Sequence, residues 1–273
     1  MFDTRKIGMK IAALRKAKDM TQLELADKMM VSYQAVSNWE RGNSLPDISK
    51  LVELSQILEV SIEELLDSEQ EAKIVEKIIH TPDEVALKEA ARVAVMMKPA
   101  ELDEVIDKKQ IEELDSETLI DLAPFVSTEK LLELIDRAKV EEMQTFVALA
   151  PFLDSEALKN LLLKQENLQG DSSMLTALAP FLDSADIVEV LQQNPDLDGG
   201  IGSLAGLAPF LEDTELETIL ENLPEDQLLS DELVGIAPFL SNKLVSRLGR
   251  RALDLGKRGL FRALLPFMDD SEF

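Results

Sequence analysis

The chain has 273 residues, which is long for a single core and predicts two units. Its apolar residues (45%) include few aromatic ones (4% of the chain), and this composition favours packed helices over a β-sandwich. It contains no cysteine and one histidine, His80, which excludes disulfides, thiolate metal sites and multi-histidine metal sites, and we expect no cofactor. The net charge of −25 opposes non-specific binding of the whole chain to nucleic acid, and no apolar run could span a membrane, so we expect a cytoplasmic protein without a membrane partner.

The charge is unevenly distributed along the chain. Residues 1–50 carry nine basic and six acidic side chains, a net charge of +3. Residues 68–273 carry nineteen basic and forty-two acidic side chains, a net charge of −23. Only the N-terminal end of the chain is therefore suited to approach phosphates.

The first 66 residues predict five short helices. Residues 4–17 place apolar side chains at helical spacing, and Thr21 with Glu24 forms a capping box that opens a second helix. Ser32 can cap a third helix that stops at Gly42. The fourth and fifth helices begin after Asp47 and Ser61.

Five motifs in this region carry a family resemblance: LRKAK, TQLELA, VSYQAVSNWERG, PDISKL and LEVSIEELL. With them, residues 7–66 resemble the Xre/Cro family of phage-repressor-like helix-turn-helix proteins. The resemblance implies a five-helix lambda-repressor-like domain whose third helix, residues 33–41, lies in the major groove of DNA.

The resemblance also implies roles for the polar residues of the motif. Gln and Asn side chains can bond adenine through two hydrogen bonds, and Arg can do the same with guanine. We expect base contacts from Tyr33, Gln34 and Asn38, with Ser32, Ser37 and Arg41 in support, and contacts to the DNA backbone from Gln22 and Asn43.

Two further residues of the motif are expected to act on the fold. The family commonly pairs an arginine of the first helix with a glutamate at the end of the third, which predicts a structural ion pair between Arg15 and Glu40. In the turn before the third helix the family usually has glycine, whereas this chain has Met30. A left-handed backbone at that position costs a non-glycine residue about 1 kcal/mol.

The rest of the chain is repetitive. Helices are predicted near residues 70–79 and 82–97, the second opened by Thr81, Pro82 and Glu84. Beyond them, the tetrad Ala-Pro-Phe-(Leu/Val) recurs with its prolines 27 to 29 positions apart, and a looser copy ends the series; these prolines are residues 124, 151, 180, 209, 238 and 266. A Ser, Asp or Glu three positions after each proline can cap a helix.

Each repeat is interpreted as a capped helix, a polar link and a second helix kinked near its end by the proline. Residues 99–118 are interpreted as a degenerate first repeat. Short helix pairs of this kind bury their apolar faces only by stacking, so the sequence predicts an α-solenoid. The predicted organisation is a DNA-binding domain at 1–67, a helical linker at 68–98 and a repeat domain at 99–273.

The repeats end in a basic segment. Residues 241–262 carry seven basic side chains and one acidic one, after a stretch, 140–240, with twenty acidic and two basic ones. The basic segment is interpreted as a solvated end or as an electrostatic contact with an acidic surface of the same chain or of a second subunit. A second DNA contact is a weaker alternative.

These features favour a sequence-specific transcriptional regulator over an enzyme, because no nucleophile–base set and no phosphate-binding glycine loop is present. Its expected partners are a palindromic double-stranded DNA operator and a second copy of the chain, since readers of this type bind two half-sites. The acidic repeats would dimerise, sense a signal or bind a partner. The alternatives are a peptide-responsive, pheromone-receptor-like regulator and a protein-interaction scaffold or antitoxin-like module.

Overall fold

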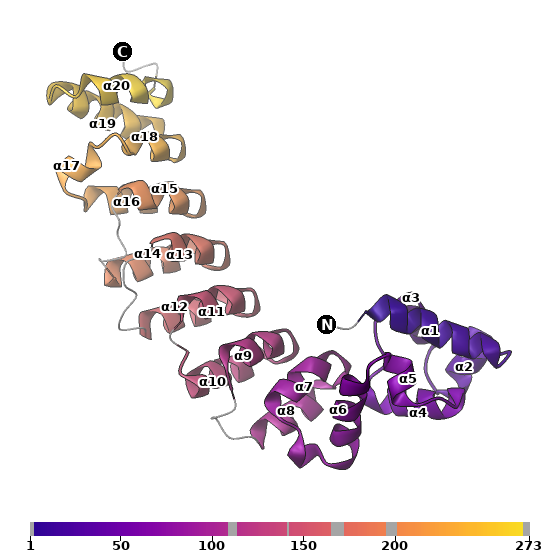
Figure 1. Ribbon diagram of the computed structural model, residues 1–273. Helices are drawn as coiled ribbons and strands as arrows, with labels where there is room; N and C mark the ends of the chain where they lie inside the picture. Colours follow the sequence, from indigo (N-terminus) through magenta and orange to yellow (C-terminus); the bar gives the residue numbers. More distant parts are fainter. Residues whose placement is uncertain (1–2, 109–113, 141, 165–171, 195–200, 270–273) are drawn as a thin grey trace. The chain divides into compact units, whose positions relative to one another are not determined.

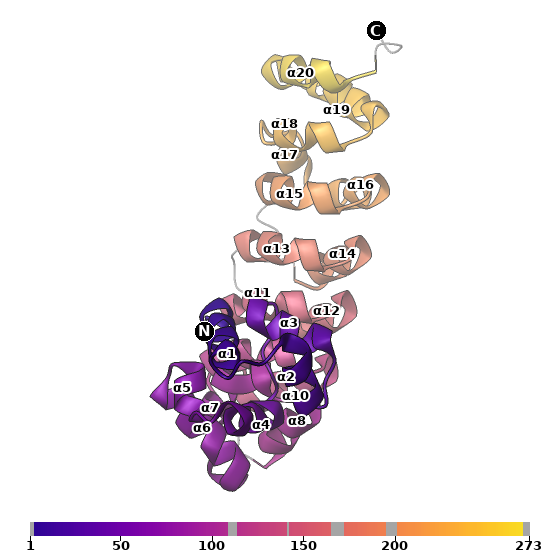
Figure 2. The ribbon, with the colours of Figure 1, turned by 90° about the vertical axis from the view of Figure 1, so that its right-hand side faces the viewer.

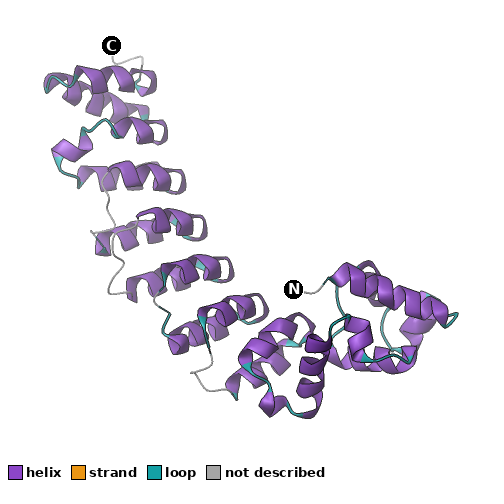
Figure 3. Ribbon diagram, in the orientation of Figure 1, coloured by secondary structure: helices purple, strands orange, loops and turns teal. Residues whose placement is uncertain are grey.

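The computed structural model describes residues 3–108, 114–140, 142–164, 172–194 and 201–269. Within these ranges every regular element is helical, as Figure 3 shows, which confirms the predicted all-α fold class. The chain divides into two compact units, Met1–Val140 and Glu141–Phe273. None of the helices in the described ranges combines the length and the apolar character needed to cross a membrane.

The first unit begins with the five predicted helices, coloured indigo to purple in Figure 1. They are α1 (Thr4–Ala17), α2 (Gln22–Lys28), α3 (Tyr33–Arg41), α4 (Ile48–Leu58) and α5 (Ile62–Leu66). The predicted caps are confirmed, because Thr21, Ser32, Asp47 and Ser61 each accept a hydrogen bond from the amide three residues later. The helix ends are thus set by local sequence, while their packing comes from the core.

The hydrophobic core of the first five helices also includes side chains that follow the fifth helix. Leu25, Val36 and Leu54 from the first five helices pack in one cluster with Val75 and Met96. The last two belong to the segment 68–98, predicted as a helical linker, so this segment contributes to the core of the DNA-binding domain. The predicted boundaries at 67 and 98 stay a prediction.

The remaining elements of the first unit, with η for a 3-10 turn, are α6 (Glu69–His80), η1 (Pro82–Glu84), α7 (Leu87–Val93), η2 (Ala94–Met96), α8 (Pro99–Asp107), α9 (Ser116–Leu122), η4 (Ala123–Phe125) and α10 (Thr128–Ala138). The prediction of a single helix over 82–97 is wrong at its start, where Pro82–Glu84 forms a separate 3-10 turn. Thr81 makes no side-chain cap, and α7 begins at Leu87, where the Ala86 amide donates to the Glu89 carboxylate at 3.0 Å.

The proline repeat has a different shape from the predicted one. In each copy an α-helix ends before Ala-Pro-Phe, and these three residues form a 3-10 turn instead of a kinked last turn. Proline lacks an N–H and its ring clashes with the preceding helical turn, so it favours the start of a new element. The predicted cap three positions later is made by Ser127, Asp154 and Ser241, but not by the side chains of Asp183 and Glu212.

The first copy of this module lies earlier than predicted. The elements α7, η2 and α8 repeat the order of helix, 3-10 turn and helix, with Ala94-Val95-Met96 standing 29 positions before Ala123-Pro124-Phe125. The interpretation of 99–118 as the first repeat is therefore wrong. The sequence pattern does not reveal this copy, because it lacks the proline and the phenylalanine that mark the other repeats.

In its described residues the second unit is built from such modules, with one further short helix, α17, between two of them. Its elements are α11 (Met143–Leu149), η5 (Ala150–Phe152), α12 (Ser155–Lys164), α13 (Ser172–Leu178), η6 (Ala179–Phe181), α14 (Ser184–Gln193), α15 (Ile201–Leu207), η8 (Ala208–Phe210), α16 (Asp213–Glu221), α17 (Glu225–Leu228), α18 (Leu233–Ile236), η9 (Ala237–Phe239), α19 (Asn242–Asp254), α20 (Arg258–Leu264) and η10 (Leu265–Phe267). In two of the repeats the segment between the two helices, 165–171 and 195–200, lies outside the described residues, so the predicted polar link is not tested there.

Successive modules of the second unit stack layer on layer, as Figures 1 and 2 show from two directions. Helices α11, α13, α15 and α18 form one row and α12, α14 and α16 another. Polar bonds join the layers: Ser155 Oγ lies 2.5 Å from Asp186 Oδ2, and Lys159 Nζ lies 2.8 Å from Asp186 Oδ1. This stacking confirms the predicted helical repeat.

The basic end of the chain finds acidic partners within the same unit. Arg247 Nη2 lies 3.1 Å from Glu221 Oε1, and Arg251 Nε lies 2.6 Å from Glu225 Oε1. Lys257 Nζ donates to the Leu229 carbonyl at 2.9 Å. These contacts support the interpretation of the basic segment as a contact with an acidic surface of the same chain.

Candidate nucleic-acid interface

Helix α3, which the sequence predicts to read DNA, is defined at both ends by local sequence. Ser32 Oγ accepts from the Ala35 amide at 3.1 Å and so begins the helix. Gly42 ends it with a left-handed backbone (φ +71°), a conformation that glycine adopts without a steric penalty. A Cβ at Gly42 would also lie 2.7 Å from the Arg5 Cα. The helix is thus held to nine residues.

The buried side of α3 packs very closely on α1. Val36 and Trp39 are buried, as is Ala26 of the neighbouring helix α2. A Cβ built on Gly8 of α1 would lie 2.3 Å from the Trp39 carbonyl oxygen, which is too close for any side chain. Sequence reasoning missed Gly8, although a lone glycine among good helix formers is a signal for such an approach.

A buried polar cluster fixes the C-terminal end of α3. Arg15 Nη2 donates to Glu40 Oε2 at 2.9 Å, Gln22 Nε2 donates to the same oxygen at 2.7 Å, and Arg15 Nη1 donates to the Met20 carbonyl at 2.5 Å. The cluster therefore ties α1, α2 and α3 together.

The electrostatics of this cluster favour the charged pair. Burial alone would raise the pKa of Glu40, but the hydrogen bonds from Arg15 and Gln22 outweigh it, and the pKa lies below its ordinary value. The hydrogen bond to Glu40 in turn raises the pKa of Arg15 above its ordinary range. Glu40 is therefore ionised at neutral pH and keeps α3 in one orientation.

The opposite side of α3 carries the predicted reading residues. Tyr33, Gln34 and Arg41 are exposed, as is Ser32 at the N-cap, while Ser37 and Asn38 are half-buried. Asn43, just beyond the helix, is exposed. The structure therefore brings seven of the eight predicted DNA-binding residues onto or beside one helix.

Two of the predicted side chains already have partners inside the protein. Arg41 Nη2 donates to Asn38 Oδ1 at 2.9 Å, and because an amide oxygen has two lone pairs, this bond is compatible with a second one from adenine to the same oxygen. The eighth residue, Gln22, lies on α2 and uses its amide N–H on Glu40.

The turn before α3 contains the predicted departure from the family. Met30 has φ +50°, in the left-handed region, and its side chain is 84% exposed. Lys50 of α4, which sequence reasoning did not single out, donates to the Met29 carbonyl at 2.9 Å. This bond lies at the end of α2, directly before the residue with the left-handed backbone.

Comparison with known proteins agrees with this geometry. A family model described as helix-turn-helix matches residues 11–65. The HTH-type transcriptional activator BcrR of Enterococcus faecalis is 39% identical over 61 residues, which are 22% of this chain and 30% of BcrR. This chain thus spans less than a third of the length of that relative.

A second relative is matched over most of its own length. The cryptic phage CTXphi transcriptional repressor RstR of Vibrio cholerae is 34% identical over 97 residues, which are 34% of this chain and 87% of RstR. Among solved structures, ComR from Streptococcus suis covers 97% of this chain and 94% of its own at 16% identity, with a TM-score of 0.23, too low to compare the two arrangements. The chain belongs to the helix-turn-helix family of transcriptional regulators of the Xre/Cro type, and its DNA-binding domain includes residues 11–65.

Proposed function

We propose that the chain is a sequence-specific reader of double-stranded DNA that inserts α3 into the major groove. The observation that carries the proposal is the division of α3 into a buried face, locked by Gly8 and the Arg15–Glu40 pair, and an exposed polar face. A rigid helix with the exposed Gln34 in its first turn and the half-buried Asn38 one turn later has donors and acceptors that match those of adenine.

The charge distribution supports specific over non-specific binding. A net charge of +3 over residues 1–50 provides few phosphate contacts, and the acidic remainder of the chain is repelled by DNA. We therefore expect affinity to depend on base contacts and on the pairing of two copies at a palindromic operator, with half-sites about one helical turn apart. The acidic repeats would provide dimerisation, signal sensing or partner binding.

The test begins with selection of bound sites from random DNA by the full chain, followed by anisotropy titrations of the best site. Gln34→Ala or Asn38→Ala should each weaken binding by about 10- to 100-fold, since a two-bond base contact contributes about 1–3 kcal/mol. The matched controls are Gln193→Ala and Asn222→Ala, exposed amides of the second unit, which should leave affinity unchanged.

Two outcomes contradict the proposal. If no sequence is enriched by the selection, the chain is not a specific reader. If Gln34→Ala and Asn38→Ala bind the selected site as the native chain does, with Trp39 fluorescence unchanged, α3 is not the reading element. Deletion of one half-site tests the dimer separately: equal affinity for the whole and the half operator would argue against paired reading.

A further inference from the structure

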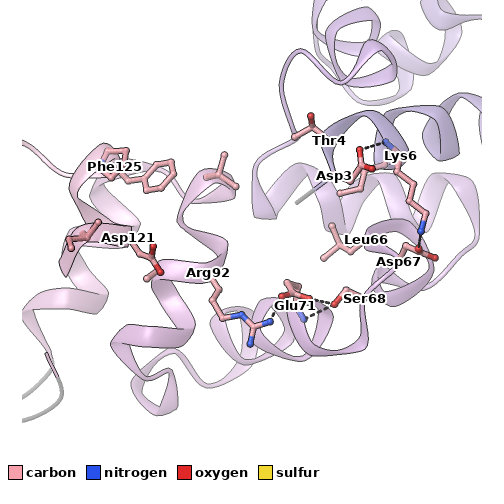
Figure 4. A pocket seen from close by; sticks show the side chains of 15 residues that line it. Asp3, Thr4, Lys6, Leu66, Asp67, Ser68, Glu71, Arg92, Asp121 and Phe125 are labelled. Carbon is pink, nitrogen blue, oxygen red and sulfur yellow. Dashed lines mark hydrogen bonds and ion pairs between the residues drawn. The ribbon is translucent and has the colours of Figure 1, made fainter. Parts of the chain in front are cut away.

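A cleft lies inside the first unit, between the DNA-binding helices and the first repeat modules. Its volume is about 720 Å³, within the range of small-molecule sites. Figure 4 shows Asp3, Thr4 and Lys6 of the α1 region on one side, Asp121 and Phe125 of α9 and η4 on the other, and Glu71 and Arg92 between them. The cleft therefore touches both the helix that supports α3 and the modules that follow.

The cleft leaves apolar surface in contact with water. Val95 of η2 is 47% exposed and Phe125 of η4 is half-buried, and both line the cleft, together with the buried side chains of Ile7 and Leu66. Removal of apolar surface from water is favourable by about 25 cal/mol per Å². A ligand with an apolar body gains from this surface.

The charged groups of the cleft determine whether it favours a positively or a negatively charged ligand. Its lining includes four carboxylates and two cations, a net charge of −2. Both cations bond to carboxylates of the cleft itself, Lys6 to Asp67 and Arg92 to Glu71. The carboxylates beyond these pairs are Asp3, whose Oδ1 also caps α1, and the exposed Asp121. An anion is therefore repelled, and a cation is attracted.

We propose that this cleft binds a small apolar amine, with the ammonium group at one of the two carboxylates on its opposite sides, Asp3 or Asp121, and the apolar body against Val95 and Phe125. The inference rests on the proposed function, because it gives the DNA reader an effector. A ligand that joins the first turn of α1 to η4 acts on the helix against which α3 is locked through Gly8 and Arg15. Ligand binding and DNA binding are then linked in both directions.

The binding test uses three probes with the same ring and different charge: naphthylethylamine, naphthylethanol and naphthylacetate. Calorimetric titration of the full chain should give an affinity for the amine about two- to fivefold above that for the alcohol, as one exposed ion pair allows, and weakest binding for the acid. Equal binding of the three probes, or no binding of the amine at about 1 mM, would overturn the proposal.

Variants assign the binding to the cleft. The double variant Asp3→Asn and Asp121→Asn should remove the advantage of the amine and leave the alcohol unaffected, because asparagine still caps α1. The matched control, Asp226→Asn with Asp231→Asn, changes the net charge equally at exposed positions of the second unit and should keep the advantage. Val95→Trp should fill the cleft and weaken all three probes; unchanged binding would place the ligand elsewhere.

A DNA titration separates this inference from the proposed function. Saturating amine should change the affinity of the native chain for its selected site and leave that of the Asp3→Asn, Asp121→Asn variant unchanged. If the amine binds in the cleft and DNA affinity stays constant, the effector role is refuted and the DNA reader stands. If Gln34→Ala leaves DNA binding intact, the proposed function fails whatever the probes show.

Discussion

The DNA-binding helices and the repeat modules use charge in opposite ways. In the DNA-binding helices the Arg15–Glu40 pair is buried and receives a further hydrogen bond from Gln22. In the repeats, pairs such as Arg251–Glu225 lie on the surface, with both side chains more than half exposed. The Arg15–Glu40 pair fixes one helix in one orientation. The exposed Arg251–Glu225 pair lies in water, although the less exposed Lys159–Asp186 pair does join two layers of the repeats.

Glycines of the two regions meet different neighbours. A Cβ at Gly8 would meet the backbone of α3, whereas in the repeats a Cβ at Gly206 would meet the Thr176 side chain at 2.8 Å and one at Gly235 of α18 only the Ala205 Cβ, at an ordinary 3.8 Å. The DNA-binding helices depend on a few contacts that occur once. The repeats distribute their stability over similar interfaces between neighbours. Matched substitutions in the two regions can measure this difference.

The largest effect is expected from breaking the buried pair. Glu40→Ala leaves the Arg15 guanidinium buried without its carboxylate and should lower the free energy of unfolding by about 3–5 kcal/mol. Glu225→Ala, at the exposed pair, should cost less than about 1 kcal/mol. Urea unfolding followed by the fluorescence of Trp39, the single tryptophan of the chain, reports on the DNA-binding helices, and helical circular dichroism reports on the repeats that contain Glu225. Similar costs for the two variants would refute the contrast.

The next effect concerns the two glycines. Gly8→Ala should destabilise by about 1–3 kcal/mol, because the new methyl group forces α1 away from α3. Gly235→Ala should stabilise by about 0.5–1 kcal/mol, since alanine restricts the unfolded chain and meets no obstacle in the helix. Thermal unfolding of both variants checks the opposite signs. A stabilising Gly8→Ala would show that the close approach to Trp39 is relaxed in solution.

Local signals explain what the sequence could predict. The helix starts at Thr21, Ser32 and Asp47 were predictable because each cap bonds an amide three residues away, and the repeat was visible in its prolines. The first module, at 87–107, was not predictable, because Val95 and Met96 stand where the other modules have proline and phenylalanine. The role of Gln22 toward Glu40 was also missed, since it depends on how α2 packs against α3, and a pattern along the chain carries no such distance.

Acid should weaken the DNA-binding helices through Glu40. The folded pKa of Glu40 lies below its unfolded value of 4.5, so its contribution to stability is complete above that pH and is lost as the pH falls through the folded value. The loss should be smaller than that of Glu40→Ala, because the protonated carboxyl still fills its place. In the repeats, protonation also relieves repulsion among carboxylates, so their unfolding should respond less steeply.

The measurement compares two signals over the same pH series. The urea midpoint from Trp39 fluorescence should fall below pH 4.5 faster than the midpoint from helical circular dichroism, to which the repeats contribute most of the helix. Glu40→Gln supplies the control, because it cannot titrate and should flatten the fluorescence series. If the urea midpoint of Glu40→Gln depends on pH as that of the native chain does, other carboxylates cause the loss of stability in acid.

The smallest effect is expected at a left-handed backbone conformation that occurs in both regions. Met30 before α3 and Lys139 after α10 have nearly the same left-handed φ, +50° and +49°. Glycine removes a strain of about 1–2 kcal/mol but adds freedom to the unfolded chain that offsets about 0.5–1 kcal/mol of it. Met30→Gly and Lys139→Gly should therefore each raise stability by at most about 1 kcal/mol, by similar amounts, in thermal unfolding.

The same pair of variants examines the docking of α3. Met30→Gly keeps the φ that the native turn already has, and Lys50 still closes the end of α2 on the Met29 carbonyl. The affinity for the selected DNA site should then stay within about twofold of the native value, a change of less than about 0.5 kcal/mol. A larger change would mean that methionine bends the turn away from the geometry glycine prefers. The position of α3 would in that case depend on a residue outside the reading face, and Lys139→Gly, far along the chain from that face, would show no such change.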